Sequence, residues 1–324
     1  MLRVFFDNGP GQAEALCVTD DKLRNAFAGR EQLLADLDYR IGNSDAEWLE
    51  HATEAEVILT SRHVRFPTRG AHRTRWLQTM AAGVEDLSES LPADVVLTNA
   101  SGVHGDKGAE FILAAVMMLN FHIPRFASDK IARRWDQTFG GTVAGNTVLM
   151  IGVGAIGLPA ARLLAQFGVH VIGVTRGGTP IDGVPEVISS ARIDEALSRA
   201  DVLVSTAPLT SETVGLVNAG RLASLREGAG VVVVGRSRVL DYRAMQRLLV
   251  AGHLGGAVLD VFDVEPIPEE DPIWDCPNLI ITPHCSLDDH SVYLQQCFEL
   301  FIDNLERLIQ GRELRNIVDR GLGY

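Results

Sequence analysis

The segment Val148-Leu149-Met150-Ile151-Gly152-Val153-Gly154-Ala155-Ile156-Gly157 decides the fold of this 324-residue chain. Its four leading apolar residues predict a buried strand, and the stretch that follows, up to Gly168, has apolar residues at helical spacing. Between strand and helix lies the pattern GxGxxG, whose glycines permit a tight turn, close approach of a pyrophosphate, and close helix–strand packing. The helix N-terminus adds free N–H groups for phosphate. The sequence therefore predicts a dinucleotide site, rather than a purely structural turn, at Gly152, Gly154, Ala155, Ile156 and Gly157.

Further apolar runs continue this strand–helix alternation toward the C-terminus. Six strands are predicted, at Thr147–Gly152, His170–Val174, Val202–Thr206, Val231–Gly235, Ala257–Val261 and Leu279–Thr282. Strands alternating with helices in this way are typical of a doubly wound parallel sheet of the Rossmann type. We place this dinucleotide-binding domain at residues 102–286.

The first hundred residues show a second, shorter alternation. Strands are predicted at Arg3–Phe6, Val57–Thr60, Trp76–Met80 and Val95–Thr98, and helices at Asp20–Leu37 and Ser44–Ala55. A long apolar helix is expected from Gly105 to Ile123, and an amphipathic helix over Asp288–Gln310 is expected to return the chain to the first domain. The fold class is therefore α/β, with two doubly wound parallel-sheet domains. The flavodoxin-like substrate domain comprises residues 1–101 and 287–324.

Composition narrows the class of protein. A net charge of -13 disfavours nucleic-acid binding, which needs a basic face, and disfavours an anionic membrane surface. No apolar run is long enough to span a bilayer, and Met1–Phe6 is typical of a strand rather than of a signal peptide. The four cysteines have no CxxC spacing and no cluster has metal-ligand spacing. We expect a cytoplasmic protein with reduced cysteines and no metal site.

The end of the second Rossmann strand bears on which dinucleotide binds. It runs Gly173-Val174-Thr175-Arg176-Gly177-Gly178, without the carboxylate that would hold the ribose 2′-hydroxyl of NAD(H). Thr175 adds no negative charge, and the guanidinium of Arg176 can pair with a 2′-phosphate. The sequence therefore favours NADP(H). NAD(H) is the alternative if Arg176 is only a solvated loop residue.

Three later strands are each followed by a polar side chain, and the three side chains together suit one reaction. These are Arg236, Glu265 and His284, and the carboxyl ends of strands in a doubly wound sheet border the ligand crevice. A guanidinium grips a carboxylate, and a protonated imidazole offsets the charge that hydride addition builds on a carbonyl oxygen. A neighbouring carboxylate favours the charged imidazole. We assign Arg236 as substrate anchor, His284 as general acid/base and Glu265 as its partner.

In this order, the motifs resemble the D-isomer-specific 2-hydroxyacid dehydrogenase family over nearly the whole chain. The resemblance implies that the cofactor is also contacted by Thr206, Ala207, Pro208, Gly235 and Asp260. It also implies that the turn at Ala82 and Gly83 holds the substrate carboxylate through backbone N–H groups, beside Arg236 and His284. It implies a homodimer, and it implies a packing role for Trp135 near the hinge or the dimer arm. One departure is Ser237, followed by Arg238, where the family usually has glycine after the arginine.

These observations leave three hypotheses for function. The leading one is a reductase, of the glyoxylate/hydroxypyruvate type, that moves a hydride between NADP(H) or NAD(H) and C2 of a small D-2-hydroxy acid or 2-oxo acid. The second is an NAD-dependent oxidation of a bulkier D-2-hydroxy acid. The third is a non-enzymatic dinucleotide-sensing protein of the corepressor kind. The compact chain, without a long disordered tail, argues against the third.

Overall fold

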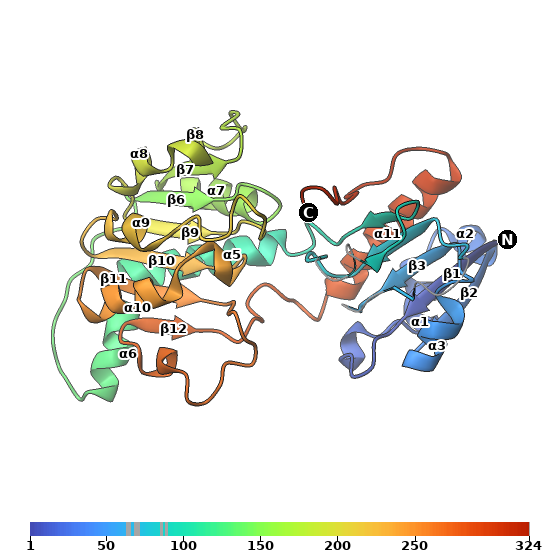
Figure 1. Ribbon diagram of the computed structural model, residues 1–324, viewed down its shortest axis with the longest axis horizontal. Coiled ribbons are helices and arrows are strands. Elements are labelled where there is room, and N and C mark those ends of the chain that lie inside the picture. Colours follow the sequence, from blue (N-terminus) through green and yellow to red (C-terminus); the bar gives the residue numbers. More distant parts are fainter. Residues whose placement is uncertain (63–65, 68–71, 85–86, 88–89, 324) are drawn as a thin grey trace. The chain divides into compact units, whose positions relative to one another are not determined.

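The computed structural model describes residues 1–62, 66–67, 72–84, 87 and 90–323. The chain divides into two compact units, one formed by Met1–Val103 with Asp289–Tyr324 and the other by His104–Asp288. Each of the two boundaries between the units lies two residues later in the sequence than the predicted boundary. Each unit is an α/β domain built on one parallel sheet (Figure 1), as the sequence predicts.

The sheet of the second unit has the order β12-β11-β10-β9-β6-β7-β8, which reverses between β6 and β9. This is the doubly wound order with its switch point beside the glycine loop. The central strands are almost wholly apolar because helices cover them on both faces. The strands are β6 (Thr147–Ile151), β7 (His170–Thr175), β8 (Glu186–Ser189), β9 (Val202–Ser205), β10 (Ala229–Val233), β11 (Leu254–Leu259) and β12 (Leu279–Ile281).

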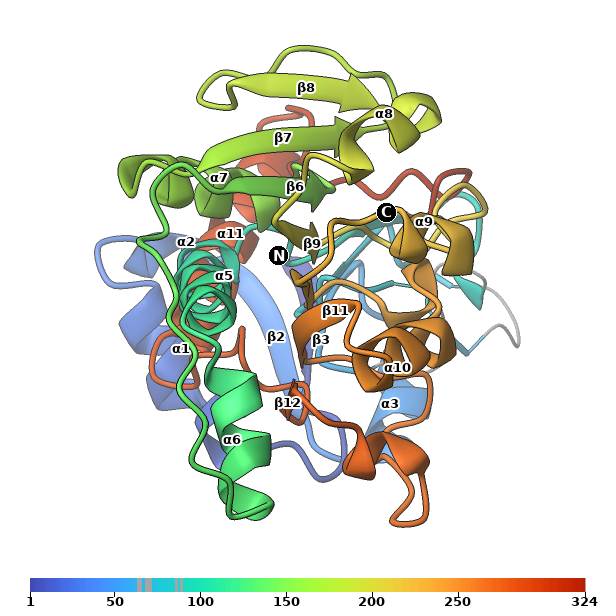
Figure 2. The same cartoon turned by 90° about the vertical axis from the view of Figure 1, so that its left-hand side faces the viewer.

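Two groups of helices cover the two faces of this sheet, and Figure 2 shows them on opposite sides. One face carries α5 (Gly105–Asn120), α6 (Ile123–Ile131) and α7 (Gly157–Gln166). The other carries α8 (Asp194–Leu197), α9 (Ala219–Ala223) and α10 (Tyr242–Val250). Short 3₁₀ turns lie at Glu14–Leu16 in the first unit, and at Ser190–Arg192, Ser237–Val239 and Pro272–Asp275 in the second.

The predicted helix from Gly105 to Ile123 is two helices in the structure. α5 ends at Asn120, and α6 starts after His122, which adopts a left-handed backbone conformation with φ of 56°. Among the described residues, no single helix has the length and apolar character needed to cross a membrane; the α5–α6 pair reaches that length only with a 63° bend. Ile112, Val116 and other apolar residues of α5 are buried in the core of the unit.

The first unit has the sheet order β2-β1-β3-β4-β5, which is the flavodoxin-like order. One face packs against α1 and α11, and the other against α3. The elements are β1 (Leu2–Asp7), α1 (Asp20–Ala26), α2 (Glu31–Ala35), β2 (Leu37–Gly42), α3 (Asp45–His51), β3 (Val57–Thr60), β4 (Trp76–Thr79), β5 (Val96–Thr98) and α11 (Tyr293–Ile309). α11 returns the chain to this unit, as expected, and buries Phe298 and Phe301 there.

The sequence patterns missed two strands, and both are edge strands. β2 pairs only with β1, and its residues were assigned to the end of a helix or left unassigned; the predicted helix Asp20–Leu37 is instead α1 and α2. β8 pairs only with β7 and makes the sheet seven-stranded rather than six-stranded. An edge strand has one neighbouring strand and partly exposed faces, so it carries polar residues and lacks the apolar run of a central strand.

An ion pair lies at the carboxyl ends of β1 and β3 in the first unit. Arg62 Nε donates to Asp7 Oδ2 at 2.7 Å, and Thr60 Oγ1 donates to the same oxygen at 2.8 Å. A second guanidinium nitrogen contacts Asp45. Burial raises the pKa of Asp7, and its hydrogen bonds only partly offset this. Burial alone would lower the pKa of Arg62, but the hydrogen bonds to Asp7 and Asp45 raise it.

Candidate active site

The glycine loop joins β6 to α7 in a backbone arrangement that few other residues would permit. Gly152 has φ of 88°, and a Cβ there would lie 2.9 Å from backbone atoms of Ala207. A Cβ on Gly157 would lie 2.1 Å from the carbonyl oxygen of Gly152. Thr206 Oγ1 donates to that same carbonyl at 2.6 Å. The loops after β6 and β9 are thus in direct backbone contact. A side chain at Gly152 would separate them, and one at Gly157 would collide with the carbonyl of Gly152 within the glycine loop.

Gly154 differs from its two neighbouring glycines because a Cβ there would meet no described atom within 4 Å. It is exposed, as is Ala155, and both precede the N-terminus of α7. A helix N-terminus presents N–H groups and the positive end of its dipole. Space at Gly154 and donors at Ile156 and Gly157 therefore fit the pyrophosphate of a dinucleotide.

At the end of β7, the loop that follows is tightly turned. Thr175 Oγ1 accepts a hydrogen bond from the Gly178 amide at 3.0 Å. Arg176 is exposed, and its Nε lies 2.9 Å from Oε2 of Glu212, in the loop after β9. No sequence pattern connects Glu212 with Arg176, so only the structure identifies this partner.

Thr206–Pro208 and Gly235 lie in the loops after β9 and β10, at the carboxyl ends of these two central strands. A Cβ on Gly235 would lie 2.7 Å from the carbonyl oxygen of Ala207, so the loops after β9 and β10 are also in backbone contact. Ala207 is buried, whereas Pro208 is exposed and its carbonyl accepts from Thr213 Oγ1 at 2.6 Å. These loops pack beside the glycine loop, in the region where the sequence predicts cofactor contacts.

Arg236 directly follows Gly235 in extended backbone, with φ of -137° and ψ of 134°. Its side chain is half-buried, and Nη1 donates to the carbonyl of Gly235 at 3.0 Å. The following 3₁₀ turn is anchored to the loop after β9, because the Gly215 amide donates to the Arg238 carbonyl at 2.8 Å. A short, fixed turn therefore carries the guanidinium.

Glu265 and His284 lie in the loops after the neighbouring strands β11 and β12. Nδ1 of His284 is 2.7 Å from Oε2 of Glu265, and the other carboxylate oxygen accepts from the Phe262 amide at 2.7 Å. His284 has φ of 48°, a left-handed conformation that is uncommon outside glycine and is found at functional turns. The carboxylate and imidazole predicted to act together are therefore in direct contact.

Asp260 is buried at the end of β11 and organises the histidine turn. Its Oδ1 accepts from Thr282 Oγ1 at 2.7 Å and from the amides of Cys285 and Ser286, both at 3.3 Å. Asp260 therefore contacts residues on both sides of His284 in the sequence and holds the turn that carries it. Thr282 lies two residues before His284, and no sequence pattern marks it as a functional residue.

The turn predicted to hold a substrate carboxylate lies in the first unit, after β4. Asn99 Nδ2 donates to the carbonyl of Ala82 at 2.9 Å, and the Ala100 amide donates to that of Ala81 at 2.9 Å. Tyr293 in α11 donates its hydroxyl to the carbonyl of Met80. These bonds fix the carbonyl side of the turn that contains Gly83.

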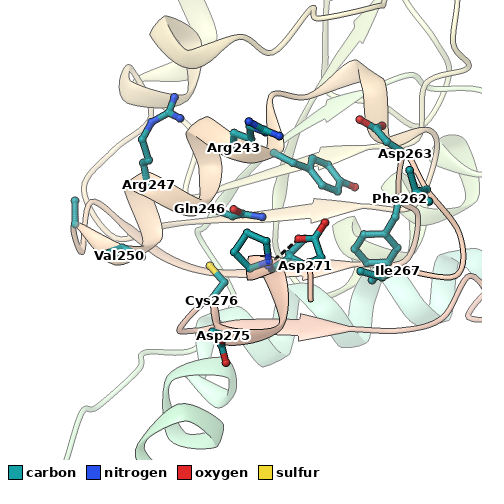
Figure 3. Close-up of a pocket in the computed structure, with 15 residues that line it drawn as sticks. Arg243, Gln246, Arg247, Val250, Phe262, Asp263, Ile267, Asp271, Asp275 and Cys276 are labelled. Carbon is teal, nitrogen blue, oxygen red and sulfur yellow. Dashed lines mark hydrogen bonds between the residues drawn. The ribbon is translucent and has the colours of Figure 1, made fainter. Parts of the chain in front are cut away.

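A cavity of about 850 Å³ lies beside α10 and the loop that begins at Phe262 (Figure 3). Its lining includes Phe262, Asp263 and Val264 of this loop and Arg243 and Arg247 of α10. Cys276 also lines it, and burial raises the pKa of this thiol to about 11. Among the described residues, no group of three or more His, Cys, Asp or Glu is arranged to hold a metal ion.

Taken together, a doubly wound sheet, a GxGxxG loop and a Glu–His pair at the strand ends define a dinucleotide-dependent oxidoreductase. The family model described as "D-isomer specific 2-hydroxyacid dehydrogenase, NAD binding domain" matches residues 113–286, more than half of the chain. The chain belongs to this family, as the resemblance in the sequence implies.

Solved and curated relatives agree with this membership. A D-isomer specific 2-hydroxyacid dehydrogenase from Xanthobacter autotrophicus Py2, solved with NADPH and MES, is 29% identical with a TM-score of 0.82, covering 100% of this chain and 99% of the other. An NADPH-dependent glyoxylate/hydroxypyruvate reductase from Sinorhizobium meliloti, solved with NADP and sulfate, is 25% identical with a TM-score of 0.81 and full coverage of both chains. A glyoxylate reductase from Thermofilum pendens is 28% identical over 247 residues, 72% of each chain.

Proposed function

We propose that this protein reduces glyoxylate, hydroxypyruvate or a similar small 2-oxo acid with NADPH. The observation that carries the proposal is the 2.7 Å contact between His284 and Glu265, in the same unit as the glycine loop and Arg236. Two of the relatives, from Sinorhizobium meliloti and Thermofilum pendens, bear the name of a glyoxylate reductase. NAD(H) is the alternative cofactor.

When bound, a reduced nicotinamide supplies the hydride that C2 of the acid accepts. Glu265 engages Nδ1 of His284, so Nε2 is the ring nitrogen that donates a proton to the carbonyl oxygen. The carboxylate of Glu265 stabilises the protonated imidazole before this transfer and fixes the orientation of the ring. Arg236 pairs with the substrate carboxylate, which its planar guanidinium can hold through two hydrogen bonds.

Backbone N–H groups at Ala82 and Gly83 are proposed to hold the same carboxylate. The carbonyl side of that turn is bonded within the first unit, which fixes its backbone for such a role. On the cofactor side, we propose contacts from the glycine loop, from Thr175 and Arg176, and from the strand-end residues Thr206, Ala207, Pro208, Gly235 and Asp260. For Asp260, its buried carboxylate supports an indirect contribution, through the turn that carries His284.

The experiment that tests the proposed function is a panel of 2-oxo acids assayed with NADPH and with NADH. We expect the highest kcat/KM for a small acid with NADPH, measured from the absorbance of the reduced nicotinamide. A higher kcat/KM for a bulky acid with NADH would contradict this proposal and favour an NAD-dependent dehydrogenase of a bulkier D-2-hydroxy acid. Cofactor binding without turnover of any acid would favour a sensor.

We also propose a homodimer. Three large apolar side chains on or after α6 are almost fully exposed in the single chain, Ile131 at 85%, Trp135 at 95% and Phe139 at 85%. Exposed apolar groups in one segment are typical of a surface that a partner covers. Sedimentation equilibrium should give twice the mass of the chain for the wild type, and Trp135→Ala should weaken the association. A monomeric wild type would contradict the proposal.

A further inference from the structure

The loop from Phe262 to Glu265, which carries the proposed partner of His284, is packed against the core at Phe262 and exposed from Asp263 to Glu265. Asp263 and Val264 line the cavity of about 850 Å³, and the Val264 residue is 61% exposed. Figure 3 shows Phe262 and Asp263 on this loop, across the cavity from Arg243 and Arg247 of α10. Phe262 packs against the core of the unit, and its ring centroid lies 6.1 Å from that of Tyr242. The three residues that follow are exposed, so hydrogen bonds contribute more to their position than apolar burial does.

One of those hydrogen bonds comes from the residue directly after Arg236. Ser237 is buried, with 7% of its surface exposed, and its Oγ donates to Oδ1 of Asp263 at 2.6 Å. The turn that carries Ser237 is itself fixed, because the amides of Gly215 and Val217 donate to the carbonyls of Arg238 and Val239. The bond therefore connects a fixed turn with the exposed part of the loop.

We infer that Ser237 is a positioning residue that holds the Glu265 loop in a fixed place relative to Arg236. The inference rests on the proposed function, in which Arg236 holds the acid while His284 transfers the proton. Asp263 lies two residues before Glu265, so a displacement of Asp263 moves the carboxylate that orients His284. Glycine, which the family usually has at this position, has no side chain to make this bond.

The size of the expected effect follows from the kind of bond. A hydrogen bond to a charged group contributes more than one between neutral groups. Asp263 is exposed, so water replaces part of the lost bond when the hydroxyl is removed. We therefore expect Ser237→Ala to lower kcat by about three- to tenfold, while the KM for NADPH stays unchanged because the glycine loop is intact.

Variants of the acceptor separate the bond from the charge. Asp263→Ala removes the acceptor and should lower kcat as much as Ser237→Ala does. Asp263→Asn keeps an oxygen that accepts from Ser237, so its kcat should stay close to that of the wild type. The double variant, Ser237→Ala with Asp263→Ala, should be no slower than either single variant. Asp275→Ala, which removes another exposed carboxylate from the lining of the same cavity, is the matched control.

Two kinetic outcomes would overturn the inference. If the losses in the double variant multiply, Ser237 and Asp263 act independently. If Asp263→Asn is as slow as Asp263→Ala, the charge of Asp263 matters rather than its bond to Ser237.

Amide hydrogen exchange tests the same inference without turnover. In Ser237→Ala and in Asp263→Ala, exchange in the peptide over residues 259–266 should speed up, while exchange over residues 148–160 should not. Unchanged exchange over 259–266 in both variants would refute the positioning role. If the wild type reduces no 2-oxo acid, the proposed function fails, and the exchange result still decides whether Ser237 positions the loop.

Discussion

Each of the two sheets places a basic side chain against a carboxylate at the carboxyl ends of neighbouring strands, and the two pairs have the same separation. Arg62 Nε lies 2.7 Å from Asp7 Oδ2 in the first unit, and His284 Nδ1 lies 2.7 Å from Glu265 Oε2 in the second. Their exposure is opposite. The side chains of Arg62 and Asp7 are 3% and 0% exposed, and those of His284 and Glu265 are 52% and 35% exposed.

This difference separates a pair that supports the fold from a pair that is suited to chemistry. A buried pair that loses one partner leaves a charge without water or counter-charge, which costs several kcal/mol. An exposed pair contributes about 0–1 kcal/mol to stability, since water solvates either partner alone. An exposed imidazole can also reach a substrate and exchange its proton with it. Distance alone does not distinguish the two roles, whereas burial does.

The largest expected effect is on catalysis, in His284→Ala. Loss of a general acid lowers the rate by about 10²- to 10⁴-fold, so kcat should fall within that range with the best 2-oxo acid. The urea midpoint should barely change, because the pair is exposed. An unchanged kcat would remove His284 from the chemistry, and a large loss of stability would contradict the contrast between the two pairs.

The next effect is on stability, in Arg62→Ala. The free energy of unfolding should fall by about 3–5 kcal/mol at pH 7. Burial already raises the pKa of Asp7, and loss of Arg62 raises it further. An acid whose pKa is raised on folding favours the folded state at low pH and disfavours it as pH rises, so the defect should shrink toward pH 4. Replacing both partners, by Arg62→Met with Asp7→Leu, should recover much of the loss; no recovery would argue against an ion-pair origin.

A third pair, Arg176 with Glu212, is exposed like the His284–Glu265 pair, and we expect it to affect cofactor choice. Arg176→Ala should raise the Kd of NADPH by about tenfold, equivalent to about 1.4 kcal/mol, with little change for NADH. Glu212→Gln keeps the guanidinium and removes a carboxylate that would compete with a 2′-phosphate, so it should not weaken NADPH. Fluorescence titration of both cofactors measures this. Equal weakening of NADPH and NADH by Arg176→Ala would exclude a role in selecting the phosphate.

The smallest effect is expected at the amino end of the second sheet, where Glu186 begins β8. Hydrogen bonds from Arg199 lower the pKa of Glu186 to about 2. Burial opposes this shift, and a hydrogen bond with His170 adds to it. A carboxylate whose pKa is lowered on folding stabilises the fold above its unfolded pKa of about 4.3 and loses this contribution as pH falls toward 2. Glu186→Gln should cost about 1 kcal/mol at pH 7, and less at pH 3. A constant difference between pH 7 and pH 3 in urea unfolding would disprove this titration.

The sequence predicted the central strands and the glycine loop well because these residues experience one dominant environment. Val148–Ile151 and Val231–Val233 are buried on both faces, so each residue is apolar. The edge strands β2 and β8 were missed because buried positions are mixed with partly or fully exposed ones along each strand, so neither forms a continuous apolar run. The break between α5 and α6 was also missed, since it depends on the backbone of His122.

For the candidate site, the sequence by itself determined which residue types stand at the strand ends and in what order. It did so because parallel strands bring their carboxyl ends to one edge, whatever the chain between them contains. Only the tertiary structure decided which of those side chains touch, and how deeply each is buried. The contacts of Asp260 with Thr282, Ser237 with Asp263 and Arg176 with Glu212 join loops that are more than 20 residues apart in sequence. Hydrogen bonds act over about 3 Å, so such contacts depend on loop conformations that no local pattern specifies.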